Sequence, residues 1–276
     1  MILSDLSLIG WPLAAALVLL GLHVYLGLHV VMRGVIFVDL ALAQVAAFGT
    51  ALGVIIGWEA DAYQSYLLAL GCTFLGALLF SFFRSKRKSI PQEAIIGITY
   101  VIAAAAMILL FSKSPHGGEE INHLLVGSIL FVTPETVWMT TVLYLILGLI
   151  HWRWRKQFWA VSLLYSNDNA GKNEKTTNWY WDLFFYVTFG LVVTNSVKIA
   201  GVLLVFSFLI IPSIAAAMFV TTIRNRLIFG WIFGLIASVG GMVASLFLDL
   251  PAGAALVVTF GLLLILTAVT GKLTRT

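Results

Sequence analysis

Two kinds of residue are scarce in this sequence of 276 residues. Charged residues make up 10% of it, whereas a soluble domain carries about 25%. Cysteine occurs once, as Cys72. The shortage of charge excludes a water-soluble enzyme and a disordered chain, and a single cysteine excludes a disulfide framework.

Motifs for catalysis are absent as well. The sequence contains no H-E-x-x-H, no G-x-S-x-G and no Cys/His cluster with zinc spacing. It also has no Walker A sequence, the glycine-rich loop that holds nucleotide phosphates. We therefore expect a chain that is not an enzyme, that has no cofactor of its own and that does not hydrolyse ATP by that route.

Apolar residues are abundant, at 61% of the sequence, and the mean hydropathy is +1.03. A helix that crosses a membrane needs about 20 apolar residues. Polar positions divide the chain into nine such stretches, at 8–31, 35–57, 65–83, 94–112, 128–150, 182–197, 200–220, 227–247 and 252–271. The sequence therefore predicts an all-α, multi-pass helical bundle in a lipid bilayer, as one transmembrane domain over residues 1–276.

The sixth stretch, 182–197, is the weakest of the nine. It is short, and the polar residues Asn195, Ser196 and Lys198 lie at its end. Eight spans plus a half-helix is therefore the alternative to nine spans.

The distribution of basic residues predicts an orientation. With nine spans, all of the 16 Lys and Arg residues except Lys113 and Lys198 fall on one face of the membrane. Lys and Arg accumulate on the cytoplasmic side of short loops. We therefore expect the N-terminus outside and the C-terminus in the cytoplasm. This basic rim also accounts for the net charge of +4, so no nucleic-acid partner is expected.

Polar and small residues within the spans are the next guide to function. Asp39 is the only carboxylate plainly inside a span, and such residues tend to be functional. So few intramembrane charges argue against an ion-coupled carrier or channel, which stays the alternative function. Pro212 lies within the 200–220 span and is expected to kink it. Gly49, Gly53 and Gly57, at four-residue spacing on one face of the 35–57 span, favour close helix packing.

Five segments, in order along the chain, resemble one family. They are RGVIFVDLALAQVAAFG (33–49), EAIIG (93–97), LVGSILFVTPE (125–135), VKIAGVLLVFSFLIIP (197–212) and LDLPAG (248–253). Together they are similar to the permease subunits of bacterial ABC importers for zinc, manganese and iron.

The resemblance implies a function and a set of partners. The chain would form a homodimer in the bacterial inner membrane and move a divalent metal ion, or a metal complex, by alternating access. It would receive the metal from a periplasmic or extracellular metal-binding protein and be driven by a separate ATPase that uses ATP and Mg. A scaffold protein without transport is a further alternative.

The resemblance also implies a cytoplasmic segment with a coupling helix that seats in a groove of the ATPase. By position, this segment is expected at about 158–175, beginning near Phe158. Its Ala170-Gly171 pair is similar to the family's coupling turn. A plain connecting loop is the alternative interpretation of the same segment.

The family's metal-handling pair is an Asp and a His four residues apart, and this sequence departs from it. The His position holds Gln44, and the nearest carboxylate, Asp39, lies five residues earlier. Five residues place the two side chains roughly 140° apart around a straight helix. A local π-bulge would bring them back to one face. The candidate pathway residues are Asp39, Gln44 and Pro212, with Asp39 also a candidate metal ligand or a structural partner of a neighbouring helix.

The segment SPHGGEEINH, which we expect in an outer loop, contains a further candidate site. Its group of His116, Glu119, Glu120 and His123 would capture a cation or contact the binding protein. An exposed polar loop explains the same residues equally well. His23 and His29 lie six residues apart and cannot hold one ion jointly on a helix, so we expect them to be packed.

Overall fold

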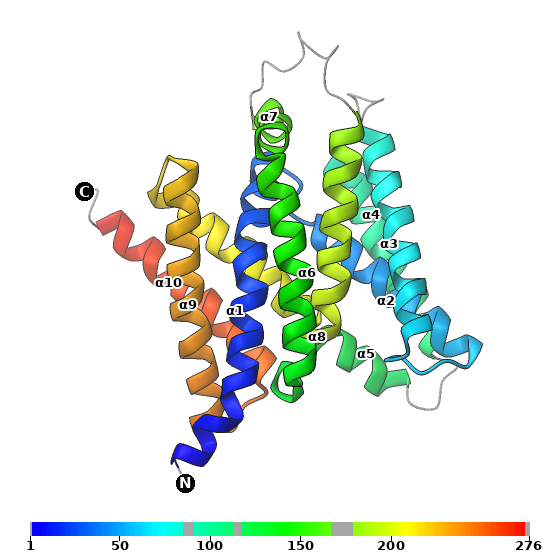
Figure 1. Ribbon diagram of the computed structural model, residues 1–276, viewed down its shortest axis with the longest axis horizontal. Helices are drawn as coiled ribbons and strands as arrows, with labels where there is room; N and C mark the ends of the chain where they lie inside the picture. The colour runs from blue at the N-terminus through cyan, green and yellow to red at the C-terminus, as the bar shows by residue number, and fades with distance from the viewer. Residues whose placement is uncertain (1, 85–90, 113–116, 167–178, 274–276) are drawn as a thin grey trace. The chain divides into compact units, whose positions relative to one another are not determined.

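The structure is a computed structural model that describes residues 2–84, 91–112, 117–166 and 179–273. In these ranges it contains α-helices and one short 3-10 turn (Figure 1). In chain order the elements are α1 (Ile2–Arg33), α2 (Val38–Ile56), α3 (Tyr63–Arg84), α4 (Gln92–Phe111), α5 (Gly117–Val126), the 3-10 turn η1 (Ile129–Phe131), α6 (Pro134–Arg153), α7 (Arg155–Ser166), α8 (Trp179–Phe219), α9 (Ile223–Leu248) and α10 (Ala252–Leu273).

Eight of the described helices are long and apolar enough to cross a membrane. They are α1, α2, α3, α4, α6, α8, α9 and α10. The prediction of an all-α, multi-pass helical bundle is thereby confirmed. The expected spans agree with these helices to within a few residues, apart from the two differences described next.

The first difference concerns α8, which contains two of the predicted spans, 182–197 and 200–220. Its 41 residues would extend for about 60 Å as one straight helix, twice the thickness of a bilayer core. Gly201 interrupts it with a non-helical backbone (φ 73°, ψ 165°) that leaves two helical parts, 179–200 and 202–219. Pro212 keeps a helical backbone, so the break lies eleven residues before the predicted kink.

The second difference is the start of α6, where the predicted span 128–150 is wrong at its N-terminal end. Gly127 adopts a left-handed backbone (φ 72°), and the short turn η1 follows. The hydroxyl of Thr133 then accepts a hydrogen bond from the Thr136 N–H (3.2 Å), as an N-cap residue does. Pro134 is the first helical residue, where its missing N–H costs nothing.

Two shorter helices, α5 and α7, lie between the long ones, and both are too short to cross a bilayer. α5 replaces most of the predicted outer loop, which corrects that expectation. Its ten residues were below the spanning length that hydropathy identifies. α7 occupies the first part of the predicted coupling segment, where the resemblance implied a helix, so this part is not a plain connecting loop.

The chain divides into two compact units. Unit 1 consists of Met1–Val31, Val126–Gly148 and Lys198–Thr276, and unit 2 consists of Met32–Leu125 and Leu149–Val197. In unit 2, α2 packs against both α3 and α4. Gly49 and Gly53 face α3, where a Cβ on Gly49 would lie 2.6 Å from the Cα of Ala69. The predicted role in close packing is confirmed for Gly49 and Gly53 and is wrong for Gly57, which ends α2 in a left-handed conformation (φ 102°) with nothing within 4 Å of a Cβ.

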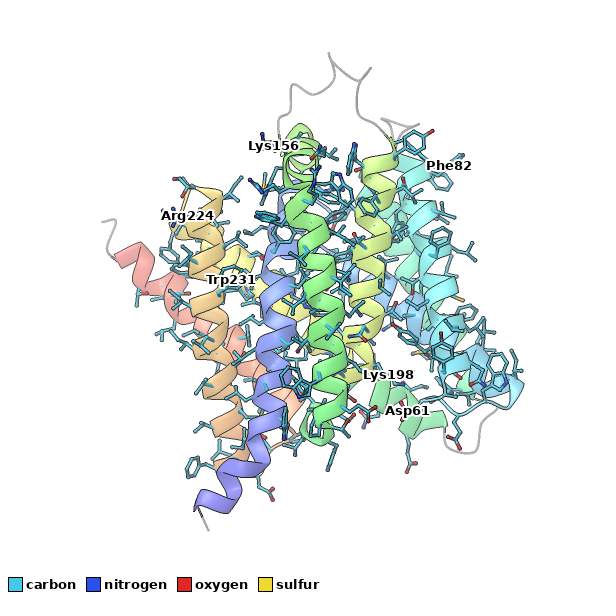
Figure 2. The ribbon with its side chains drawn as sticks, viewed as in Figure 1. Asp61, Phe82, Lys156, Lys198, Arg224 and Trp231 are labelled. Atoms are coloured by element: carbon cyan, nitrogen blue, oxygen red, sulfur yellow. The ribbon has the colours of Figure 1, made fainter. Side chains whose placement is uncertain are left out.

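In unit 1, α9 packs against α10, and α1 contacts α8 and α9. Gly27 lies against the backbone of Leu209, and the Ser213 hydroxyl of α8 is 3.3 Å from the Val24 carbonyl oxygen of α1. From α9, Trp231, which is labelled in Figure 2, donates its indole N–H to the carbonyl of Gly21 at 3.1 Å. Small residues thus allow close approach of helices in this unit too.

Candidate functional site

Asp39 lies in the first turn of α2 and is buried, with 1% of its surface exposed. Neither of its carboxylate oxygens has a hydrogen-bond partner among the described residues. A buried polar group without a partner is costly, and in a membrane protein such a group is typically functional. The partial positive charge at the N-terminus of α2 offsets part of this cost for the carboxylate.

Gln44 is the second candidate on α2. It is 2% exposed, and its amide oxygen also lacks a partner among the described residues. It shares a helix face with Ala47 and Ala51, three and seven residues further along, and these two alanines pack against α4. Gln44 therefore lies on the side of α2 that is turned towards α4.

Asp39 occupies a different face of the same helix. It aligns with Ala43, Ala46 and Thr50, at spacings of four, seven and eleven residues. α2 is α-helical from Val38 to Ile56 and contains no π-turn. The π-bulge that would have brought Asp39 and Gln44 together is therefore not formed, and the two side chains stay about 140° apart.

Other candidate metal ligands do not gather around Asp39. Among the described residues, no three His, Cys, Asp or Glu side chains lie close enough to hold a metal ion together. What α2 offers is a single buried carboxylate and a separate buried amide. Such an arrangement suits a brief contact with a passing cation better than a tight binding cage.

The histidines of α1 are packed within unit 1. Nδ1 of His23 lies 2.6 Å from the Leu19 carbonyl oxygen, and its ring lies 6.1 Å from that of Tyr144 in α6. The ring of His29 meets Tyr25 edge to face, with ring centroids 4.7 Å apart. The two histidines have different partners, in agreement with the packing interpretation.

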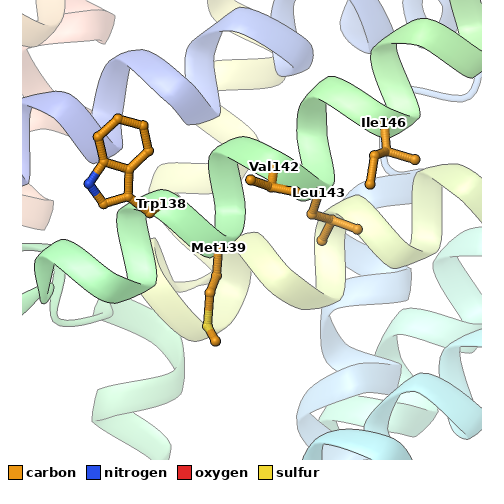
Figure 3. Close-up of a pocket in the computed structure, with 5 residues that line it drawn as sticks. All are labelled: Trp138, Met139, Val142, Leu143 and Ile146. Carbon is orange, nitrogen blue, oxygen red and sulfur yellow. The ribbon is translucent and has the colours of Figure 1, made fainter.

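A surface pocket lies along α6 (Figure 3). It is lined by Trp138, Met139, Val142, Leu143 and Ile146, all apolar side chains of this one helix. It offers no oxygen or imidazole ligand to a cation. We therefore do not assign the metal pathway to this pocket.

Of the predicted outer group, Glu119 lies in α5 and is exposed. Glu120 and His123 belong to the same helix, which corrects their placement in a loop. The side chains of these two residues, and His116 as a whole, lie outside the described part of the chain.

The predicted coupling segment is described up to Ser166. Its first residue, Phe158, is fully buried, and its ring stacks on His151 at 4.2 Å and on Phe184 at 5.7 Å. Phe158 therefore holds α7 to the ends of α6 and α8, and its side chain presents no surface to a partner. Ala170 and Gly171 lie outside the described residues.

A buried ion pair at the same end of unit 2 was missed by the sequence interpretation. Arg33, the last residue of α1, contacts Ser162 of α7 through Nε (2.9 Å) and Asp182 of α8 through Nη1 (3.0 Å). Its guanidinium carbon also lies 3.8 Å above the ring of Phe185. The sequence indicated only that Arg33 belongs to the basic rim. It gave no sign of the ion pair because the partners of Arg33 lie 129 and 149 positions further along.

Comparison with known proteins shows the family to which this chain belongs. Residues 6–271 match the ABC 3 transport family. The manganese transport system membrane protein MntC of Listeria monocytogenes is 23% identical over 235 residues, which cover 84% of this chain and 79% of the relative. The high-affinity zinc uptake system membrane protein ZnuB of Buchnera aphidicola is 24% identical over 236 residues, covering 84% and 86%.

A solved structure has the same fold. PsaBC from Streptococcus pneumoniae, in complex with Fab, superposes with a TM-score of 0.77 at 21% identity and covers 97% of this chain and 95% of the solved chain. The family match extends over nearly all of the sequence, and the resemblance drawn from the five motifs is confirmed. The chain belongs to the ABC 3 transport family, whose members among these relatives are membrane proteins of manganese and zinc transport systems.

Proposed function

We propose that this chain is the permease subunit of a bacterial ABC importer for zinc, manganese or iron, as the free divalent ion or as a complex. It moves the metal across the inner membrane by alternating access, with its N-terminus outside and its C-terminus in the cytoplasm. This orientation counts the two helical parts of α8, on either side of Gly201, as separate crossings. The observation that carries this proposal is the family match over residues 6–271. The relatives named for manganese and zinc transport support the class of cargo.

In this proposal Asp39 is the pathway residue that contacts the metal. Its two unpartnered, buried oxygens support this role, because carboxylate oxygen suits manganese and also binds zinc. Gln44 and Pro212 line the pathway at other points. Because Asp39 and Gln44 lie on different faces of α2, the metal contacts them one after the other. Weak successive contacts allow a cation both to enter and to leave.

The motor is a separate ATPase, which binds ATP and Mg and docks on α7 and the residues that follow, 167–175. The exposed face of α7, with Lys156, Ala160 and Leu163, supports this docking surface. The opposite face, with Phe158 and Ser162, is buried in unit 2. α7 therefore combines a free face for a partner with a face fixed to the permease.

Two further partners complete the importer. A metal-binding protein outside the membrane docks near α5, on the group formed by His116, Glu119, Glu120 and His123. A second copy of this chain provides the other half of the pathway. The exposed carboxylate of Glu119 supports the first of these contacts.

The test is metal uptake by proteoliposomes that contain this chain, its ATPase and its binding protein. We expect radioactive Mn²⁺ or Zn²⁺ to accumulate only when all three proteins and ATP are present. A non-hydrolysable ATP analogue serves as the control and should abolish uptake. Equal metal flux through liposomes that contain this chain alone would overturn the proposal in favour of an ion-coupled carrier or channel.

A further inference from the structure

The side chain of Arg33 is fully buried, and within unit 2 it joins the end of α1 to α7 and to the start of α8. It ends α1, bonds Ser162 of α7 through Nε and bonds Asp182 of α8 through Nη1. The planar guanidinium presents its donors in a fixed fork, so one side chain can bond two separate groups at once. A lysine at this position has a single ammonium group and could not keep both contacts in this geometry.

The contacts of α7 with the neighbouring helices are made by the buried face that carries Phe158 and Ser162. It has twelve residues, and only Trp154 separates it from α6. On its buried face, Phe158 packs in the aromatic cluster with His151 and Phe184, one turn before Ser162. Ser162 therefore supplies a hydrogen bond between α7 and the end of α1.

The end of α1 leads directly to the candidate metal ligand. Six positions separate Arg33 from Asp39, and the turn between them begins with Gly34 in a left-handed conformation (φ 66°). The backbone N–H of Phe37 in this turn lies 3.4 Å from a carboxylate oxygen of Glu93 in α4. A displacement of Arg33 is therefore passed along a short, constrained segment to the first turn of α2.

We propose that Arg33 is a positioning residue that transmits movement of α7 to the first turn of α2, where Asp39 lies. This inference rests on the proposed function, in which α7 is the docking element of the ATPase. When the motor displaces α7, the Ser162–Arg33 bond pulls the end of α1 and moves the turn that carries Asp39. The Arg33–Asp182 pair holds the start of α8 to the same point, so the end of α1, α7 and the start of α8 move together.

The first part of the test asks whether Arg33 holds α7. Hydrogen exchange is measured on the full chain in lipid nanodiscs, for the wild type and for Ser162→Ala and Arg33→Lys. Each substitution removes the bond to α7, and Ser162→Ala leaves the ion pair with Asp182 intact. We expect exchange of the peptide 155–166 to rise about fivefold in both, as for the loss of one buried hydrogen bond.

The matched control is Ser81→Ala. Ser81 is also a buried serine of unit 2, but its hydroxyl has no partner among the described residues. Exchange in α7 should therefore stay at the wild-type rate in this variant. If the exchange rate of α7 in Ser162→Ala and Arg33→Lys equals that of the wild type, the inference is overturned, because these bonds then do not hold the helix.

The second part measures coupling in the complete complex with its ATPase and binding protein. For Ser162→Ala and Arg33→Lys we expect Mn²⁺ uptake per ATP hydrolysed to fall about tenfold, within the usual range of coupling between distant sites. ATP hydrolysis itself should stay within about twofold of the wild type, since neither residue contacts nucleotide. A residue that only stabilised the fold would lower both activities in parallel.

Three outcomes separate the two proposals. Reduced uptake per ATP together with faster α7 exchange supports the inference. Faster exchange with an unchanged ratio of uptake to ATP hydrolysis overturns the transmitting role of Arg33 and leaves the proposed function intact. A wild-type complex without ATP-dependent uptake overturns the proposed function, and the transmitting role with it, whatever the exchange experiment gives.

Discussion

Gly127 and Gly201 lie backbone to backbone in unit 1, and both have a positive φ. A Cβ atom on Gly127 would collide with the carbonyl carbon of Ala200 and the nitrogen of Gly201. The turn that precedes α6 is thus packed against the break that divides α8. Glycine is required at Gly127 by the close approach and by its φ, and at Gly201 by a backbone region that is almost exclusive to glycine.

Replacement of either glycine by alanine should destabilise the protein. Gly201→Ala places a side chain in a strained backbone, which costs roughly 1–3 kcal/mol, and Gly127→Ala adds a collision to the same kind of strain. We expect thermal unfolding in detergent, followed by tryptophan fluorescence, to give the lowest Tm for Gly127→Ala. Gly261→Ala in α10 is the control, because a Cβ there meets nothing within 4 Å. A Tm for Gly127→Ala equal to that of the control would contradict the described backbone contact.

Asp39→Asn tests the pathway role of the carboxylate. The substitution keeps the shape of the side chain and removes its charge, so the fold should persist. We expect the rate of Mn²⁺ uptake by the complete complex to fall about tenfold or more, the loss of about 1.4 kcal/mol of interaction. Glu135→Gln, an exposed carboxylate in the first turn of α6, is the matched control. Uptake that survives in Asp39→Asn would assign Asp39 a structural role instead.

The separation of Asp39 and Gln44 on α2 predicts how a metal-binding pair can be built. Gln44→His alone adds an imidazole but leaves it about 140° from Asp39, so zinc affinity should hardly change. Leu40 lies four residues before Gln44, on the same face. The double variant Leu40→Asp/Gln44→His should therefore bind Zn²⁺ about tenfold tighter than either single variant. Titration calorimetry of the purified chain measures this, and an equally tight Gln44→His variant would refute the described helix geometry.

Phe158 should be the main apolar anchor of α7. Removal of a large, fully buried aromatic side chain costs about 3–5 kcal/mol, so Phe158→Ala should lower the Tm strongly and release α7. Leu163→Ala on the exposed face of the same helix is the control, with an expected effect within about 0.5 kcal/mol. Parallel exchange measurements on 155–166 show whether α7 itself is released. Equal Tm values for the two variants would contradict the anchoring role.

The membrane helices could be predicted from the sequence because their signal is local. A run of about 20 apolar residues is sufficient to identify a span, whatever its neighbours are. The angular separation of Asp39 and Gln44 also followed from their spacing alone. The predicted start of the span that became α6 was wrong because residues 128–133 are apolar enough to extend a span. Hydropathy does not register the left-handed backbone of Gly127.

The contacts that organise the candidate site could not be predicted in the same way. Arg33 pairs with Asp182 across 149 positions, and nothing near either residue in the sequence indicates the other. The burial of Phe158 depends on rings that α8 contributes after a long intervening segment. Both are tertiary contacts between distant segments, and the order of residues in one sequence does not record such contacts.

The short connection between α6 and α7 has a consequence for how this chain can vary. Trp154 alone separates the two helices, and its backbone is hydrogen-bonded to Ile150 on one side and to Phe158 on the other. Insertion of one residue after Trp154 would rotate α7 by about 100° and turn its buried side chains away from their partners. The length of this connection is thus constrained as tightly as the side chains it places, and a deletion or insertion there should be less tolerated than many substitutions in the spans.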